Sequence, residues 1–254
     1  MIGKFSIAFA VAVAVLIEVP CASAQATCQN PGQMVPCMQA FFANLGFAGQ
    51  NNGFPYNNTV FVSTLHNYVM QNDIAGWNNL QKWMNTLITC AGGQSAFEAC
   101  GDWHILMTQF NISQQEAVEY ESQFRVLEYE TGPAFPVITH NWFCMKQVDQ
   151  TEGQVVQMCR QHFDDEQHQN PNMTCPHIVE LLNCIERPFV THCGRDVAAV
   201  QCNIEKIIYS IVAPDCNSHL ALQCNGSFNP LKKGTKKLQK TQKLQKTRKL
   251  GKLH

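Results

Sequence analysis

The sequence predicts an all-α protein that is held together by disulfide bonds and has little or no sheet. Apolar residues recur at intervals of three and four in several long segments, which is typical of helices with one buried face. No two alternating segments are joined by an Asn-Gly or Asp-Gly turn, so strand hairpins are not expected. The chain also holds 13 cysteines in 254 residues, enough to connect the predicted helices into stapled hairpins.

Residues 1–24 have the features of a secretory signal peptide. Lys4 precedes an apolar segment over residues 5–17, Pro20 ends that segment, and Ala22-Ser23-Ala24 matches a cleavage site. The apolar segment is too short to span a bilayer, which disfavours the alternative of an uncleaved anchor. We therefore expect the mature chain to begin at Gln25. No other apolar run is long enough for a transmembrane segment.

Loss of Cys21 with the signal peptide leaves an even number of cysteines, which in a secreted chain indicates up to six disulfide bonds. Four Asn-X-Ser/Thr sequences are candidate N-glycosylation sites, and they agree with an extracellular location. The candidate glycosylation sites are Asn57, Asn111, Asn172 and Asn225. The candidate disulfide cysteines are Cys28, Cys37, Cys90, Cys100, Cys144, Cys159, Cys175, Cys184, Cys193, Cys202, Cys216 and Cys224.

The formal net charge of −1 combines two regions of opposite charge. Residues 25–230 hold seven Lys or Arg and 18 acidic residues, whereas residues 231–254 hold ten basic residues and no acidic one. The C-terminal segment has too few apolar residues to form a core, so we expect a disordered tail. Its basic residues are candidates for binding a sulfated glycan or another polyanion, namely Lys232, Lys233, Lys236, Lys237, Lys240, Lys243, Lys246, Arg248, Lys249 and Lys252.

Three other interpretations of the tail stay open. It could be a solvated extension, it could fold back onto the acidic body, or it could be released as a cationic peptide by cleavage at dibasic pairs such as Arg248-Lys249. An extracellular protein or a sulfated glycan is the expected partner. Nucleic acid is not expected for a secreted chain.

Individual helices can be placed from their end signals. Residues 73–90 carry apolar positions on one face, with Asp73 as a candidate N-cap. Ser113 and Glu116 form a capping-box pattern at the start of a helix that should stop at Gly132-Pro133. Residues 46–58 are expected to form a loop because they are rich in Gly and Asn.

The spacing of cysteines suggests two modules. Four lie between residues 25 and 132 and eight between residues 133 and 230, with a hinge-like sequence, Thr-Gly-Pro-Ala-Phe-Pro, at the boundary. We expect an N-terminal helical module over residues 25–132 and a cysteine-dense module over residues 133–230.

Cys175, Cys184, Cys193 and Cys202 recur at nine-residue intervals, and Pro188 lies between the middle two. We predict a helix over residues 176–187, a turn at Pro188-Phe189 and a second helix from Gly194-Arg195, because proline interrupts helices. Positions that face each other across such a hairpin give the pairs Cys184–Cys193 and Cys175–Cys202.

The sequence contains no nucleophile elbow, zinc-protease helix, P-loop or papain-like cysteine motif, and no cofactor is predicted. Cys175, His177, His192 and Cys193 could bind zinc, but their spacing departs from that of structural zinc sites, so disulfides are favoured. Residues 163–170 could bind a cation, although a solvated loop is the favoured interpretation.

Two aromatic or histidine features have both a structural and a functional interpretation. His104 is expected to be a satisfied helical histidine rather than a general base. The tryptophans are expected in the core, with a ligand groove as the alternative; they are Trp77, Trp83, Trp103 and Trp142.

The order of cysteines, with an early Cys28-x8-Cys37, a Phe-Cys-Met-Lys sequence at residues 143–146 and His-Cys-Gly-Arg at residues 192–195, resembles nematode secreted cysteine-rich proteins. The resemblance is to the domain of unknown function nineteen and to chondroitin-proteoglycan-like domains, and it spans residues 28–224. It implies an extracellular, mostly helical domain without an assigned enzyme activity. The chain lacks the Ser-Gly dipeptide to which chondroitin is attached.

These observations favour a secreted, N-glycosylated, disulfide-rich protein with a binding or structural role and no enzymatic activity. The alternatives are a secreted hydrolase whose site is assembled from residues distant in sequence, and a precursor of a cationic peptide. The hydrolase would require a concave pocket with convergent polar groups and shifted pKa values.

Overall fold

The computed structural model describes residues 28–49, 53–221 and 223–224, and within these ranges the chain is helical and contains no strand. The helices are α1 (Pro31–Ala43), α2 (Asn58–Cys90), α3 (Gln94–Cys100), α4 (Trp103–Phe110), α5 (Gln114–Thr131), α6 (Phe135–Gln169), α7 (Thr174–Cys193), α8 (Arg195–Val212) and α9 (Asn217–Leu220). The all-α prediction is therefore confirmed. The predicted signal peptide and basic tail lie outside the described residues.

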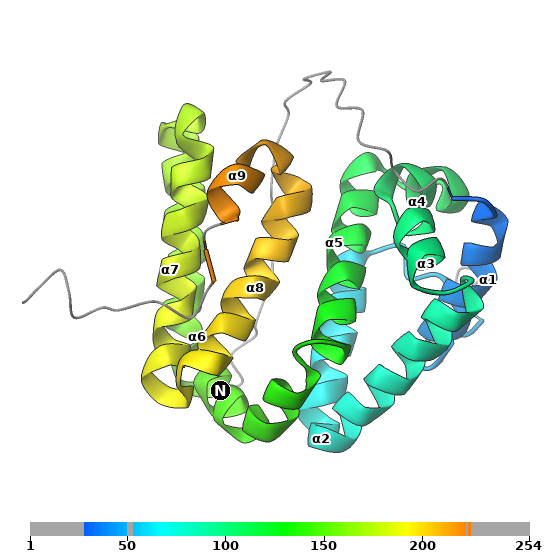
Figure 1. Cartoon of the computed structure of the whole chain (residues 1–254), viewed down its shortest axis with the longest axis horizontal. Coiled ribbons are helices and arrows are strands. Elements are labelled where there is room, and N and C mark those ends of the chain that lie inside the picture. Colours follow the sequence, from blue (N-terminus) through cyan, green and yellow to red (C-terminus); the bar gives the residue numbers. More distant parts are fainter. Residues whose placement is uncertain (1–27, 50–52, 222, 225–254) are drawn as a thin grey trace, which may run out of the picture.

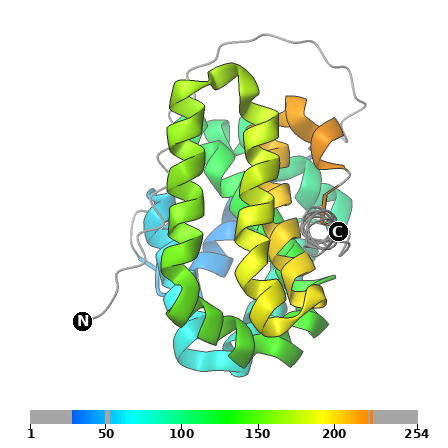
Figure 2. The ribbon, with the colours of Figure 1, turned by 90° about the vertical axis from the view of Figure 1, so that its left-hand side faces the viewer.

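The helices form two groups that meet along α5 and α8 (Figure 1). The first group consists of α1 to α5, and the second consists of α6 to α9. Figure 2 shows that α6 and α7 run side by side as the two longest members of the second group. A short connection from Gly132 to Ala134 joins α5 to α6 and brings the two groups together at one end of the molecule.

The hydrophobic core consists of two clusters of buried residues. The larger cluster contains rings from α1, α2 and α5, among them Phe41, Phe42, Phe61 and Tyr120. Phe189 of α7 also belongs to it, together with Val197, Ala198 and Val200 of α8. The smaller cluster joins α6, α7, α8 and α9. The segments before and after residue 132 thus share part of one core.

Six disulfide bonds connect all twelve described cysteines. Cys28–Cys100 and Cys37–Cys90 lie within the first helical group. Cys144–Cys193 and Cys159–Cys184 join α6 to α7, Cys175–Cys216 joins the start of α7 to the turn before α9, and Cys202–Cys224 anchors the C-terminal end of the described chain to α8. Among these described cysteines, no disulfide bond joins a residue before position 133 to a residue after position 132.

The predicted pairs Cys184–Cys193 and Cys175–Cys202 are wrong. Helix α7 continues through Pro188 to Cys193, and the turn lies at Gly194, whose φ of 90° suits glycine. On one continuous helix, nine residues span about 13 Å, whereas bonded cysteines need Cα atoms within about 7 Å. A turn at Gly194 also places Cys175 opposite the end of α8, close to Cys216.

Pro188 is tolerated inside α7 because its surroundings hold the helix in place. It is buried next to Phe189, and the bonds from Cys184 and Cys193 attach α7 to α6 on both sides of it. A proline inside a helix costs about 3 kcal/mol, and each disulfide contributes about 2–4 kcal/mol. The two disulfide bonds to α6 thus outweigh the tendency of proline to interrupt a helix, on which the predicted turn at Pro188 was based.

Two predicted helix signals are present in the structure. Ser113 and Glu116 form a capping box at the start of α5, and α5 ends at Thr131, just before Gly132. Asp73 lies at a kink inside α2, with φ 51° and ψ −135°, so the second half of α2 does begin where the sequence indicated. A left-handed φ at a residue other than glycine costs about 1–3 kcal/mol, which calls for contacts that stabilise it.

Candidate ligand cavity

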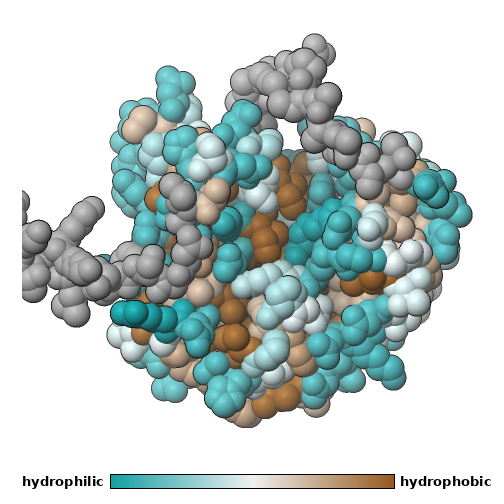
Figure 3. Space-filling view, viewed as in Figure 1, coloured by the Kyte–Doolittle hydropathy of each residue, from teal (hydrophilic) through white to brown (hydrophobic). Residues whose placement is uncertain are grey.

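A cavity of about 640 Å³ lies between the two helical groups. This volume falls within the range of sites that hold small ligands. Helices α2, α5, α6 and α8 form its walls, and Phe189 of α7 completes them. Figure 3 shows hydrophobic residues along the middle of the molecule, between the side formed by α7 and α8 and the side formed by α5.

Helical periodicity places one face of α6 against the cavity. The lining residues on α6 include Trp142, Met145, Asp149, Gly153 and Val156, which follow one another at intervals of three and four. The lining continues to Asp165, so the cavity extends along more than six turns of α6, or about 35 Å. This shape suits an elongated ligand better than a compact one.

The kink in α2 lets both halves of that helix line the cavity. Leu65 and Val69 come from the first half, and Trp77 and Leu80 come from the second. The kink is held by α6, because Asp73 Oδ1 accepts hydrogen bonds from Trp142 Nε1 at 2.8 Å and from Lys146 Nζ at 2.6 Å. Lys146 Nζ also donates to the Met70 carbonyl at 2.8 Å.

Glu130 provides an uncompensated carboxyl group in the cavity wall. It follows Val126 and Leu127 by one turn of α5, so it lies on the same inward face. Surrounding protein atoms raise the pKa of Glu130 to about 8, and loss of hydration is the cause. No basic group of the described residues contributes to this shift. Such a group is a candidate for function.

Asp149 is a second cavity carboxyl with a raised pKa. Burial raises the pKa of Asp149, and the charge of His66 partly offsets this effect. His66 reaches the same cavity from α2, so the two side chains link α2 and α6 electrostatically. The effects that act on Asp149 differ from those on Glu130, because only Asp149 has a basic neighbour.

Glu205 and Arg160 form an ion pair between α8 and α6 at the cavity wall. Glu205 is 1% exposed, and its Oε1 accepts from Arg160 Nη2. Its other oxygen, Oε2, is buried and has no hydrogen-bond partner among the described residues. Burial raises the pKa of the neighbouring Tyr209 hydroxyl, and the negative charge of Glu205 adds to this shift.

Trp77 adds a second buried polar atom without a partner. Its Nε1 finds no acceptor within the described part of the chain, although the side chain is 6% exposed. Trp77 and Trp142 pack edge to face with ring centroids 5.6 Å apart, and both rings line the cavity. Buried donors and acceptors are nearly always paired in proteins, so unpaired groups at a cavity suggest that a ligand supplies the partners.

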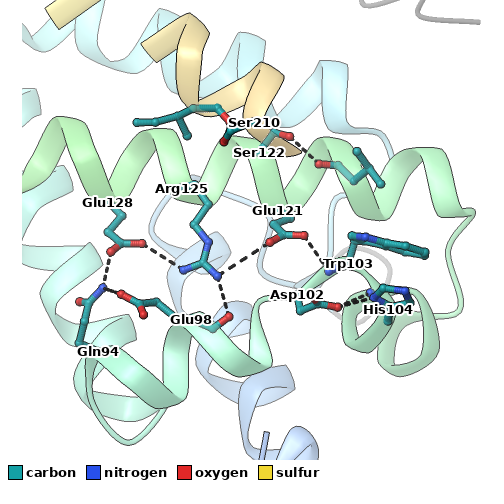
Figure 4. Close-up of polar contacts among 12 residues, drawn as sticks. Gln94, Glu98, Asp102, Trp103, His104, Glu121, Ser122, Arg125, Glu128 and Ser210 are labelled. Carbon is teal, nitrogen blue, oxygen red and sulfur yellow. Dashed lines mark hydrogen bonds and ion pairs between the residues drawn. The ribbon is translucent and has the colours of Figure 1, made fainter. Parts of the chain in front are cut away.

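The opposite face of α5 is attached to α3 and α4 by polar contacts (Figure 4). Arg125 lies 3.4 Å from Glu128 and 3.8 Å from Glu121, and its Nη2 donates to the Glu98 carbonyl of α3 at 2.6 Å. Glu121 also accepts from the Trp103 backbone N–H at 3.0 Å. Because Glu121 is buried, its pKa is raised, and the Trp103 hydrogen bond opposes that shift. These contacts fix the rotation of α5 and therefore the direction of Glu130.

The sequence-predicted residues are distributed around the cavity rather than gathered in it. Trp77 and Trp142 belong both to the core and to the cavity, so the two interpretations of the tryptophans coincide there. Trp83 packs on Tyr68, and Trp103 stacks on His104. His104 is exposed and its Nδ1 lies 2.7 Å from Asp102 Oδ1.

The structure does not form either of the two cation sites considered as alternatives, the zinc site at Cys175 and Cys193 and the cation site over residues 163–170. Cys175 and Cys193 are in separate disulfides, which leaves no thiolate for zinc. Residues 163–169, expected in a solvated loop, instead form the last turns of α6, and Asp164 and Asp165 line the cavity. Within the described ranges, no group of three or more His, Cys, Asp or Glu side chains is arranged to hold a metal ion.

Three candidate glycosylation sites are exposed. Asn57 caps α2, Asn111 follows α4 and Asn172 lies between α6 and α7, so their side chains are open to attachment of a glycan. Asn225 and the basic residues 232–252 lie outside the described residues. No helix in the described part of the chain has both the length and the hydrophobicity needed to cross a membrane.

Comparisons of the chain with protein-family models, with curated protein sequences and with solved structures found no match. The cavity itself is therefore the principal evidence on function. Of its acidic residues, only Asp164 and Asp165 belong to a segment that the sequence singled out, the possible cation site over residues 163–170. Glu130 could have been noticed as an acid on the apolar face of α5.

Proposed function

We propose that the protein is a secreted, N-glycosylated, non-enzymatic binding protein that carries a small elongated ligand in the cavity between its two helical groups. The observation that carries this proposal is a 640 Å³ cavity whose walls are largely apolar and contain two buried polar atoms without partners. Six disulfides and the absence of a membrane-spanning helix among the described residues suit an extracellular carrier.

A fluorescent apolar probe tests the proposal. N-phenyl-1-naphthylamine emits more strongly in apolar surroundings, so it should brighten on addition of the disulfide-intact protein. Gly153 is buried on α6 and lines the cavity, so Gly153→Leu should occupy part of the ligand volume. Leucine also favours helix more than glycine by about 1 kcal/mol, so weaker probe binding would not follow from a weaker helix.

Gln150→Leu is the matched control, because it adds a leucine to an exposed position of the same helix. We expect the control to bind the probe as the wild type does and Gly153→Leu to bind it at least tenfold more weakly. An absence of probe binding, or equal binding by both variants, would count against the carrier function.

The basic tail is proposed to hold the carrier at polyanionic surfaces. Its ten Lys and Arg residues in the last 24 positions follow a body that is acidic overall. Sulfated glycans are the extracellular ligands that such a segment would recognise through charge. The alternative of a released cationic peptide makes a different prediction, namely that the secreted protein ends before His254 in an intact-mass measurement.

A hydrolase is the second candidate, and the raised pKa of Glu130 favours it. A carboxyl group that stays protonated near neutral pH can act as a general acid. The cavity lining contains no Ser, Thr, Cys or Lys among the described residues, so a covalent nucleophile there would have to be a carboxylate, His66 or Tyr209. Turnover of chromogenic glycosides or esters that is lost in Glu130→Gln would support this candidate.

A further inference from the structure

The charges of the cavity indicate the chemical class of its ligand. Among the described residues, five acidic side chains line it, whereas Arg160 is the single Lys or Arg and His66 the single histidine in the lining. The acidic residues are Glu130, Asp149, Asp164, Asp165 and Glu205. A cavity with this balance favours a positively charged group over a negatively charged one.

The charged groups do not contribute equally to this preference. Arg160 neutralises Glu205 directly, and its charge also reaches Asp164. His66 acts on Asp149. For Glu130, no basic neighbour of this kind is found among the described residues, although α2, α6 and α8 all line the cavity that it faces. Glu130 is therefore the position at which an added positive charge would gain most.

The unpaired buried atoms provide an observation independent of the acidic residues. Glu205 Oε2 needs a donor, and Glu205 is almost completely buried at the wall. A ligand with N–H groups supplies donors of this kind. Apart from the charged side chains, His66 and four glutamines (Gln123, Gln157, Gln161 and Gln201), the lining is apolar, and its apolar residues come mainly from α2, α6 and α8. The part of the ligand beyond its polar end should therefore be mainly hydrocarbon.

We propose that the cavity binds a long-chain amine, with the ammonium group at Glu130 of α5 and the hydrocarbon chain between α2, α6 and α8. This inference rests on the proposed carrier function and specifies its ligand class. Glu130 would become ionised when the ammonium binds, and the two groups would form a charge-assisted hydrogen bond.

Binding should then depend on pH in a defined direction. Below pH 8, Glu130 holds a proton that must leave before the ammonium pair forms. An alkylammonium stays charged up to about pH 10, as lysine does. Affinity should therefore rise by about tenfold between pH 6 and pH 7 and level off above pH 8. A ligand carboxylate that accepted the Glu130 proton would show the opposite trend.

The experiment is calorimetric titration of the full-length, disulfide-intact protein with dodecylamine, dodecanol and dodecanoate, all below their micelle-forming concentrations. We expect dodecylamine to bind about tenfold more tightly than dodecanol, and dodecanoate to bind most weakly. Glu130→Gln should reduce dodecylamine affinity by about ten- to hundredfold and leave dodecanol unchanged. The control Glu180→Gln removes an exposed carboxyl from α7, away from the cavity, and should change neither.

The outcomes separate the two proposals. If none of the three probes binds, the carrier function itself is wrong. If dodecanol or dodecanoate binds as tightly as dodecylamine, or if Glu130→Gln leaves amine binding intact, the carrier function stands and the amine inference is overturned.

Discussion

Lys146 on α6 holds Asp73 at the kink of α2, with Nζ 2.6 Å from Asp73 Oδ1 and 2.8 Å from the Met70 carbonyl. One ammonium group thus binds the residue in the unusual conformation and a backbone oxygen in the turn that precedes it. Trp142 completes the arrangement through its indole N–H. Because the kink orients both halves of α2 around the cavity, this contact supports the binding site as well as the fold.

Replacement of Lys146 by methionine should lower the melting temperature and weaken probe binding, because the kink loses its main polar contact. Thr151→Met on the exposed face of α6 is the control. A double-mutant cycle with Asp73→Asn should show coupling between the two positions. Independent effects of the two substitutions would contradict the structural role of this pair.

The Asp73 contact also has a pH dependence of known sign. The hydrogen bond from Lys146, followed by that from Trp142, lowers the pKa of Asp73 below its usual value near 3.8. The stabilisation is present above that unfolded-state value and is lost as the pH falls through the lower folded-state value. Acid unfolding of the Asp73→Asn variant should therefore depend less steeply on pH below about 4 than that of the wild type.

Glu130 should act on stability in the opposite sense. Its pKa rises from 4.5 to about 8 on folding, so the folded protein retains a proton that the unfolded chain releases. Stability contributed by this group is present below about pH 4.5 and declines as the pH rises towards 8. Glu130→Gln should flatten that decline in urea unfolding curves, whereas Glu180→Gln should not. Glu121, Asp149 and Glu186 shift in the same direction, so part of the decline should persist.

Removal of one partner of the Arg160–Glu205 ion pair should lower the free energy of unfolding more than removal of both partners. Arg160→Met would leave the carboxylate of Glu205 buried without its cation, which should cost about 3 kcal/mol of unfolding free energy. Arg160→Met combined with Glu205→Leu should recover most of that loss. Equal stability of the single and double variants in urea titration would contradict this description.

The disulfide pattern can be tested by peptide mapping without reduction. We expect the six pairs of the structure, with Cys175 joined to Cys216 and Cys184 joined to Cys159. Simultaneous replacement of Cys159 and Cys184 by alanine should lower stability by about 2–4 kcal/mol. A peptide that contained Cys184 joined to Cys193 would contradict the continuous helix α7.

The basic tail makes a prediction of its own. Wild-type protein should elute from a heparin column at higher salt than a variant that lacks residues 231–254, because the tail carries ten positive charges. Elution of both forms at the same salt concentration would contradict the proposal that the tail binds polyanions, and it would leave the proposal of a ligand cavity untouched.

Local signals in the sequence predicted the class of fold and several helix ends, but they could not predict the disulfide partners. The capping box of Ser113 and Glu116 is local, and the structure contains it. Pro188 has a strong local preference to interrupt a helix, yet α6 holds α7 straight through two disulfides. Because the pairing prediction depended on a turn at Pro188, it failed together with that turn.

The cavity could not be predicted from local sequence signals, because it forms only when α2, α5, α6 and α8 pack together. Glu130, Asp149 and Glu205 lie on different helices, and each looks like an ordinary acid on a partly polar helix. Only the packing of α5 against α8 and of α2 against α6 brings them to one space. The available local signals were Glu130, an acid on the apolar face of a helix, and the acidic segment over residues 163–170, for which a solvated loop was the favoured interpretation.

A crystal structure of the secreted, disulfide-intact protein with dodecylamine would test the central claim most directly. The account predicts electron density for the hydrocarbon chain between α2, α6 and α8, with the nitrogen within about 3 Å of a Glu130 carboxylate oxygen. A cavity filled by the protein's own side chains, or an amine bound only at the outer surface, would contradict it.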